Sequence, residues 1–291
     1  MVDNLPVSDE DHYTSNLLKL NNVQILRCNL LEKNLDVKLF EGLDCIIHLA
    51  AILGVDNVLS NPRKTLDLNY RLLYNVLETA KSNVGIRFIF ASTSEVYAQS
   101  VEEGIATIPT PEETNIVLPE LSNARTTYMI SKLYGECLTH NSNVEPIIIR
   151  PHNLYGPRMG MRHVIPQLID RIRSTPKGGS LEVFSPEHTR TFCYVEDAVR
   201  QICALAFRED LKENVFNIGT ETPEIKIFEL ADKIAKMMYR GDIRLVKGGI
   251  TQGSPSRRCP DTKRIDQIMG DTNRVSLEEG LKATLSYYIK S

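Results

Sequence analysis

A tyrosine and a lysine four residues apart are the chemically most informative pair in the sequence. Tyr128 and Lys132 lie in the segment 128–132 (YMISK), and residues i and i+4 share one face of a helix. A neighbouring ammonium favours the phenolate, so it lowers the pKa of a tyrosine from about 10. We therefore expect a general base that takes a proton from an alcohol or sugar hydroxyl. The alternative is a core tyrosine beside a surface lysine.

Two further segments follow apolar runs upstream of this pair. Residues 92–97 (STSEVY) come directly after the run 86–91, and residues 48–51 (HLAA) end the run 43–51. Hydroxyl groups at the carboxyl end of a strand lie where ligands bind in open α/β sheets. Small residues after a buried strand allow the backbone to approach a flat cofactor.

The elements that must position these residues alternate between strands and helices. The expected strands are 23–28, 43–48, 86–91 and 145–150, and the expected long helices are 61–82 and 126–140. Apolar strands that alternate with amphipathic helices predict a parallel sheet covered on both faces. After about residue 157 the expected strands are shorter (181–184, 191–195, 215–218 and 243–246), which indicates a smaller, mixed second lobe.

Composition excludes several classes of protein. The 291 residues carry 34 Lys+Arg against 37 Asp+Glu, a net charge of −3, which does not favour nonspecific nucleic-acid binding. The longest apolar runs fall short of the ~20 residues that a membrane span needs, and the N-terminus shows no signal-peptide pattern. We expect a soluble, cytoplasmic protein with neither nucleic acid nor membrane as a partner.

Cysteine and histidine are scattered. The six cysteines form no CxxC pair, and the six histidines form neither HxxxH nor HExxH. We therefore expect the cysteines to be small buried hydrophobic residues in a reducing compartment, and we expect no metal site.

Taken together, the segments resemble the extended short-chain dehydrogenase/reductase family, in its nucleotide-sugar branch of NAD-dependent epimerases/dehydratases. Further matches are Asn69, residues 150–158 (RPHNLYGPR), 188–197 (HTRTFCYVED) and 257–261 (RRCPD). The resemblance spans essentially the whole chain. It implies a Rossmann-like doubly wound parallel sheet with a smaller mixed α/β C-terminal substrate lobe. Residues 1–157 would form the NAD-binding domain and 158–291 mainly the substrate lobe, with some later segments returning to the first domain.

The resemblance also implies roles for matching residues. Tyr128 is the catalytic base, Lys132 binds the nicotinamide ribose and tunes that base, and Thr93 bonds the 4-hydroxyl group of the sugar. The implied catalytic set is Thr93, Glu95, Tyr128 and Lys132. The implied cofactor is NAD, with NADP as the alternative, and its ligands are Asp3, Asn29, Leu49, Ala50, Ala51, Asn69, Tyr128 and Lys132. A nucleotide sugar, expected to be UDP-linked, is bound by Ser94, Asn153, Arg190 and Arg258, of which Asn153 and Arg190 hold the diphosphate.

The implied chemistry begins at C4 of the sugar. Tyr128 removes the proton of the 4-hydroxyl group while NAD oxidises C4, and the 4-keto sugar is then rotated and reduced, decarboxylated or dehydrated. The helices 61–82 and 126–140 correspond to those that pair in relatives, so a homodimer is expected.

The chain departs from the family pattern at its start. Family members begin with a strand, a GxxGxxG turn and a helix that binds pyrophosphate, and the 16 glycines here include no such cluster. Residues 2–5 (VDNL) resemble the end of the family's second strand. Because the first strand is central in the sheet, we expect a sequence that lacks about 25 to 35 N-terminal residues. A complete chain would put NAD binding in doubt.

Ser94, Glu95 and Arg258 discriminate among the sugar reactions. Hexose dehydratases place an Asp-Glu pair where this chain has Ser94-Glu95, so elimination here lacks its acid. Ser94-Glu95 together with Arg258 resembles UDP-glucuronate decarboxylases, where an arginine near the C5 carboxylate suits a 4-keto uronate that loses carbon dioxide as a β-keto acid. Alternatively, Arg258 is a surface or diphosphate-binding residue. A UDP-sugar 4-epimerase needs only Thr93, Tyr128 and Lys132 and also stays open.

Two readings come from other classes. A simple reductase that releases NAD(P)H would not need Asn153 and Arg190 as diphosphate ligands. A noncatalytic nucleotide-sugar-binding remnant would not need to keep Thr93, Tyr128 and Lys132, and all three are present.

Overall fold

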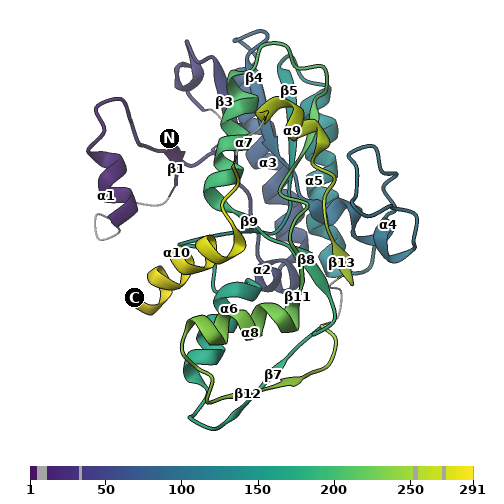
Figure 1. Ribbon diagram of the computed structural model, residues 1–291. Helices are drawn as coiled ribbons and strands as arrows, with labels where there is room; N and C mark the ends of the chain where they lie inside the picture. The colour runs from purple at the N-terminus through teal and green to yellow at the C-terminus, as the bar shows by residue number, and fades with distance from the viewer. Residues whose placement is uncertain (5–11, 33–34, 252–254, 271–272, 291) are drawn as a thin grey trace.

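The main sheet consists of four parallel strands in the order β10-β5-β4-β3. The computed structural model describes residues 1–4, 12–32, 35–251, 255–270 and 273–290 (Figure 1). The strands are β3 (Cys45–His48), β4 (Arg87–Ala91), β5 (Glu145–Pro151) and β10 (Val215–Ile218). Three of these four confirm the predicted apolar strands of the first half, and their parallel pairing confirms the predicted α/β class.

Helices cover both faces of this sheet because alternate strand residues point to opposite sides. Phe88 and Phe90 of β4 belong to one core with α3 (Pro62–Ala80) and α5 (Ala124–His140). Ile89 belongs to a second core with α7 (Val195–Phe207) and α9 (Lys263–Met269). The result is the three-layer, doubly wound arrangement that the sequence predicts (Figure 1).

The two long helices lie within one or two residues of their predicted bounds. Pro62 begins α3 at a position where a missing N–H costs nothing. The side chain of Asn123 accepts from the Arg125 N–H at 3.0 Å and caps α5. The start of α5 at Ala124 is therefore fixed four residues before Tyr128.

A second lobe packs around its own apolar core (lower part of Figure 1). Its helices are α6 (Val164–Ser174), α8 (Ile227–Met237) and α10 (Leu277–Lys290), and β7 (Ser180–Val183) pairs in parallel with β12 (Arg244–Lys247). Three short strands form a further sheet: β11 (Glu224–Lys226), β8 (Thr189–Thr191) and β13 (Arg257–Arg258). The pair β6 (Leu154–Tyr155) and β9 (Cys193–Tyr194) connects β5 with α7.

Several short elements differ from expectation. Residues 215–218 were grouped by strand length with the second lobe, but β10 pairs with β5 in the main sheet, with Phe216 opposite Ile149. The expected strand 191–195 divides between β8, β9 and the start of α7. Of residues 23–28, only Leu26–Arg27 form a strand, β2. Strand length therefore does not reveal the sheet to which a short strand belongs.

The first residues form a sheet of their own. β1 (Val2–Asp3) pairs in parallel with β2, and α1 (His12–Leu18) lies between them in the chain. Among the described residues β3 pairs with β4 alone, and Ile47 of β3 is 41% exposed. Leu5 of the VDNL segment lies outside the described residues. The short elements η1 (Val37–Phe40), α2 (Val55–Ser60), η2 (Ser94–Tyr97) and α4 (Ala98–Glu102) complete the description.

The six cysteines are free thiols, as expected, but they are not all buried. Cys193 and Cys259 are buried, whereas Cys137 and Cys203 are exposed because they lie on the outer faces of α5 and α7. Within the described part of the chain, no helix is both long and apolar enough to cross a membrane.

A glycine allows α5 to approach β4 closely. A Cβ atom at Gly135 would overlap with Cζ of the buried Phe90 ring. We predict that Gly135→Ala lowers the free energy of unfolding by about 1–3 kcal/mol, although alanine is the better helix former. Urea unfolding measures this, with Gly241→Ala as the control because no atom lies within 4 Å of that Cβ position. Equal stabilities for Gly135→Ala and the wild type would contradict the close packing.

Candidate active site

Helix α5 directs Tyr128 and Lys132 at the carboxyl end of β4. The Lys132 Nζ donates to the Ala91 carbonyl at 2.7 Å and lies 5.9 Å from the centre of the Tyr128 ring. The Thr93 side chain faces the Tyr128 hydroxyl group and lowers the pKa of the phenol. The structure thus brings together the three residues that the sequence predicts for C4 chemistry.

The predicted pKa of the tyrosine was wrong in direction. Burial raises the pKa of Tyr128 to about 12, while the Thr93 side chain lowers it and the charge of Glu95 raises it further. The Lys132 ammonium, 5.9 Å from the centre of the Tyr128 ring, does not offset this burial. Tyr128 is therefore a neutral phenol near pH 7 in this structure.

Lys132 is itself destabilised as a cation. Only 5% of the residue is exposed, and burial lowers its pKa to about 8 from an ordinary value of 10.5. A buried ammonium is costly unless its three N–H groups are satisfied. Among the described residues, Ala91 accepts one of them, so donors remain for hydroxyl groups of a bound ligand.

The short helix η2 places a carboxylate beside these groups. Thr93 accepts from the Glu95 N–H at 3.2 Å and caps η2, and Ser94 is buried in its first turn. The Glu95 carboxylate accepts from Arg258 Nη2 at 2.7 Å and pairs with Arg125 Nη2 at 3.7 Å. Although burial raises the pKa of Glu95, these two guanidinium groups hold it below its ordinary value.

The predicted diphosphate ligands line a large cavity next to this cluster. Asn153 has φ of 42°, a left-handed conformation that asparagine tolerates, and its Nδ2 donates to the Thr191 carbonyl at 2.9 Å. The Arg258 Nη1 approaches Asn153 Oδ1 at 3.5 Å. Arg190 is buried and donates to the Thr189 carbonyl at 2.6 Å. Burial lowers the pKa of Arg190 to about 10.

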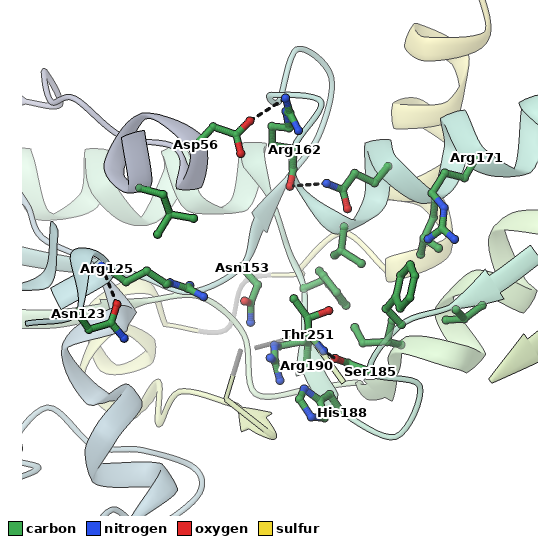
Figure 2. Close-up of a pocket in the computed structure, with 18 residues that line it drawn as sticks. Asp56, Asn123, Arg125, Asn153, Arg162, Arg171, Ser185, His188, Arg190 and Thr251 are labelled. Carbon is green, nitrogen blue, oxygen red and sulfur yellow. Dashed lines mark hydrogen bonds and ion pairs between the residues drawn. The ribbon is translucent and has the colours of Figure 1, made fainter. Parts of the chain in front are cut away.

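The cavity has a volume of about 840 Å³ and a cationic lining. Its arginines are Arg125, Arg162, Arg171 and Arg190. Figure 2 shows Asn153 between Arg190 on one side of the cavity and Arg162 on the other. Arg162 pairs there with Asp56 of α2 at 2.7 Å. A cavity of this size and charge suits a phosphorylated ligand held between the two lobes.

The segment after β3 lies on the other side of the predicted site. Leu49 is 59% exposed, Ala50 is exposed and Ala51 is half-buried. Asn69 of α3 fixes the following turn, because its Oδ1 accepts from the Ile52 N–H at 2.6 Å and its Nδ2 donates to the Ile52 carbonyl at 3.1 Å. The segment Leu49–Ala51, which is held in place by the Asn69 side chain, therefore suits contact with the flat face of a cofactor.

Asp3 and Asn29 do not join these residues in one sheet. Asp3 ends β1 and Asn29 follows β2, so the two share an edge of the separate two-stranded sheet. The Asn29 side chain accepts from the Leu31 N–H at 3.1 Å. Asn75 of α3 donates to the Leu30 carbonyl at 2.9 Å and anchors this segment to the main body.

Two groups of residues at the site were missed by the sequence analysis. Arg125 lies three residues before Tyr128, a spacing that places both on one helix face. Glu136 lies four residues after Lys132 and is buried against Arg150. Their positions three residues before and eight residues after Tyr128 on the predicted helix were the sequence signals that could have found them. Among the described residues no group of three or more His, Cys, Asp or Glu side chains could hold a metal ion.

A doubly wound sheet with tyrosine, lysine and threonine at the carboxyl end of β4 defines the short-chain dehydrogenase/reductase class. A family model for the NAD dependent epimerase/dehydratase family matches residues 3–219. The chain belongs to this family.

Curated relatives agree with this assignment. The UDP-N-acetyl-alpha-D-glucosaminuronate decarboxylase of Bacillus cytotoxicus is 31% identical over 92% of this chain and 83% of its own. The UDP-glucuronic acid decarboxylase 1 of Xenopus tropicalis is 33% identical over 87% of this chain, which spans 58% of the frog protein.

Solved structures share the fold. The UDP-N-acetylglucosamine 4-epimerase of Methanobrevibacter ruminantium has a TM-score of 0.81 at 22% identity, over 99% of this chain and 89% of its own. The UDP-glucuronic acid 4-epimerase of Bacillus cereus, in complex with UDP-glucuronic acid and NAD, has a TM-score of 0.78 at 25% identity, over 99% and 90%.

The nicotinamide ribose half of NAD fits two features of the site: the remaining N–H donors of Lys132 and the segment Leu49–Ala51. Both observations come from this structure: among the described residues the buried Lys132 ammonium has the Ala91 carbonyl as its acceptor, and Leu49 and Ala50 after β3 are exposed. Lys132, Tyr128 and Asn69 would hold this half of the cofactor or the turn beside it.

The buried Lys132 ammonium predicts a gain in stability when the charge is removed. Lysine stays protonated to higher pH in the unfolded chain, so the folded state is penalised below pH 8 and the penalty fades between pH 8 and 10.5. We expect Lys132→Met to be more stable than the wild type at pH 7, by about 3 kcal/mol, and the gain to shrink by pH 10. Urea unfolding at both pH values measures this.

The control for this comparison is Lys81→Met, because the Lys81 side chain is 65% exposed and pairs with Glu78 at the surface. Its stability should change little at either pH. A Lys132→Met variant that is less stable than the wild type, by the same amount at both pH values, would contradict the assignment of a penalised buried cation.

Proposed function

We propose that the chain is an NAD-dependent enzyme that oxidises C4 of a UDP-linked uronate and decarboxylates the resulting 4-keto sugar. The observation that carries this proposal is the ion pair between Glu95 and Arg258 at 2.7 Å, beside Thr93 and Tyr128. The Arg258 guanidinium is thereby held near the residues of the C4 chemistry, where it would meet the carboxylate at C5 of a uronate.

The chemistry at C4 falls to Thr93 and Tyr128. Thr93 orients the 4-hydroxyl group, and Tyr128 takes its proton as the carbonyl forms. NAD, when bound, supplies the oxidation of C4 and its reversal within one turnover. Lys132 holds the ribose, and its charge favours the phenolate that Tyr128 must become before it can accept the proton.

The chemistry at C5 depends on the arginines. Arg258, Arg125 and Arg190 all lower the pKa of Glu95, so three cations lie around one carboxylate. Such a cluster attracts a second carboxylate and orients it by bidentate bonds. With a ketone at C4, that carboxylate belongs to a β-keto acid: the C5–C6 bond breaks, its electrons form an enolate, and C5 is then reprotonated.

The relatives support the same reaction class. Two of them are named as decarboxylases of a UDP-linked uronate. Ser94 stands where a dehydratase would need an acid, and it is buried in η2, so elimination of water is disfavoured. The 4-epimerases among the structural neighbours make epimerisation an outcome of the test.

Product mass decides between these reactions. The full-length protein, supplied with NAD, is incubated separately with UDP-glucuronate and UDP-N-acetylglucosaminuronate, and the products are read by mass spectrometry and NMR. We expect loss of carbon dioxide from at least one of them and no net NADH. Loss of water, or an unchanged mass with an inverted C4 centre, would contradict the proposal.

A substitution at Arg258 tests recognition of the uronate carboxylate. We expect Arg258→Leu to lower kcat/KM for decarboxylation about ten- to hundredfold, because a charge-assisted hydrogen bond is lost. The matched control is Arg257→Leu, since Arg257 is half exposed and pairs with Glu224 instead. Equal losses in the two variants would contradict a specific role for Arg258.

We also propose that the protein is a homodimer that pairs through α3 and α5. Tyr70, Tyr74 and Tyr134 form one aromatic cluster across these helices, with ring centres 5.4 and 5.3 Å apart. Each of the three is between 37% and 46% exposed. An exposed aromatic cluster on two adjacent helices is the kind of surface that a twofold interface covers.

Light scattering at micromolar concentration tests this assembly. We expect a dimer for the wild type and for Phe207→Glu, which changes an 84% exposed residue elsewhere. We expect a monomer for the double variant Tyr70→Glu/Tyr134→Glu, because a symmetric interface would oppose like charges. A monomeric wild type would contradict the dimer.

A further inference from the structure

Helix α5 presents a third polar side chain on the face that carries Tyr128 and Lys132. Glu136 follows at the same spacing of four residues, so the three side chains lie one above another. Tyr128 and Lys132 contact Thr93 and Ala91. Glu136 takes no part in the proposed chemistry, and it is only 7% exposed.

Glu136 binds Ser92, the residue between Ala91 and Thr93. The Ser92 hydroxyl donates to Glu136 Oε1. Arg150 of β5 fixes the carboxylate from the other side, with Nε to Oε1 at 2.9 Å and Nη2 to Oε2 at 2.6 Å. The segment Ala91–Thr93 is therefore attached to α5 at three successive residues.

Arg150 extends the attachment to the far end of η2. Its Nη1 donates to the Tyr97 hydroxyl at 2.6 Å and to the Glu112 carbonyl at 3.0 Å. The Tyr97 hydroxyl donates in turn to Asn217 Oδ1 of β10 at 3.1 Å. One buried guanidinium thus reaches both sides of the segment that carries Thr93, Ser94 and Glu95.

We propose that Glu136 and Arg150 are positioning residues that set the distance between Thr93 and Tyr128 through Ser92. The pair acts on the reaction without contacting substrate or cofactor. This inference rests on the proposed function for its kinetic readout.

The polar character of the pair also points to positioning. A buried ion pair is weak as a source of stability, because the cost of removing both charges from water is similar to their attraction. Apolar residues of similar volume would fill the same space. What they would not do is accept the Ser92 hydrogen bond or donate to Tyr97, and those are the contacts that locate η2.

Ser92→Ala removes one hydroxyl and leaves the ion pair intact. We expect kcat to fall about 10- to 100-fold, as for a small misplacement of reacting groups, with KM within about twofold of the wild type. The control is Thr139→Val, one turn after Glu136, because the buried Thr139 hydroxyl donates to the Gly135 carbonyl of its own helix. Its kcat should match the wild type.

A single change at Glu136 does not separate folding from positioning, since it leaves Arg150 buried without its partner. The double variant Glu136→Leu/Arg150→Met removes both charges together. We expect its melting temperature to return close to the wild-type value while kcat stays as low as in Ser92→Ala. If activity returned together with stability, the pair would be merely structural and the proposal overturned.

The pH profile gives a second readout. Glu95 of η2 and Lys132 of α5 are charged groups near Tyr128, and Arg125 lies one turn before it on α5. None of the three is changed in these variants. Loss of the Thr93 contact raises the pKa of Tyr128, since that contact lowers it. The rising limb of kcat should therefore move to higher pH in Ser92→Ala and in the double variant, but not in Thr139→Val.

A measurement without substrate separates this inference from the proposed function. In protein with ¹³C-labelled tyrosine rings, the Tyr128 resonance is identified by its loss in Tyr128→Phe. We expect it to shift in Ser92→Ala and in the double variant and to stay in place in Thr139→Val. A wild type that converts neither uronate refutes the proposed function alone, whereas an unmoved Tyr128 resonance in both variants refutes the positioning.

Discussion

The site depends on one geometric constraint: the face of α5 that carries every fourth residue from Tyr128 packs against the carboxyl end of β4. Tyr128, Lys132 and Glu136 each contact one of the residues that follow or end that strand. Gly135 makes the approach possible, because any larger side chain would meet the Phe90 ring. Helix and strand therefore cannot shift without changing the contact between Thr93 and Tyr128.

Charge is distributed unevenly around this frame. Lys132 is a buried cation whose pKa falls to about 8, while Glu95 is a carboxylate held ionised by Arg258 and Arg125 despite its burial. The charged Lys132 is costly in the protein alone, whereas the ion pairs of Glu95 more than offset its burial. The electrostatic strain of the site therefore lies at Lys132, where hydroxyl groups of a ligand would relieve it.

The sequence predicted the class of fold and the C4 residues because both depend on local spacing. Parallel strands follow from apolar runs, and Thr93, Tyr128 and Lys132 meet because a strand end and a helix face adjoin. It did not predict the environment of Tyr128, whose pKa is raised by burial, nor the pairing of Val215–Ile218 with β5. Both depend on contacts between segments far apart in the chain, which no local pattern encodes.

The most direct test of the account is the turnover of Tyr128→Phe on the UDP-uronate that the wild type converts. The substitution keeps the ring and removes only the hydroxyl, so melting temperature and KM should change little. The account predicts that kcat falls about 10²–10⁴-fold, the usual loss for a positioned general base, with Tyr239→Phe unchanged because Tyr239 is 94% exposed. Wild-type turnover by Tyr128→Phe would contradict the assignment of the base and with it the proposed chemistry at C4.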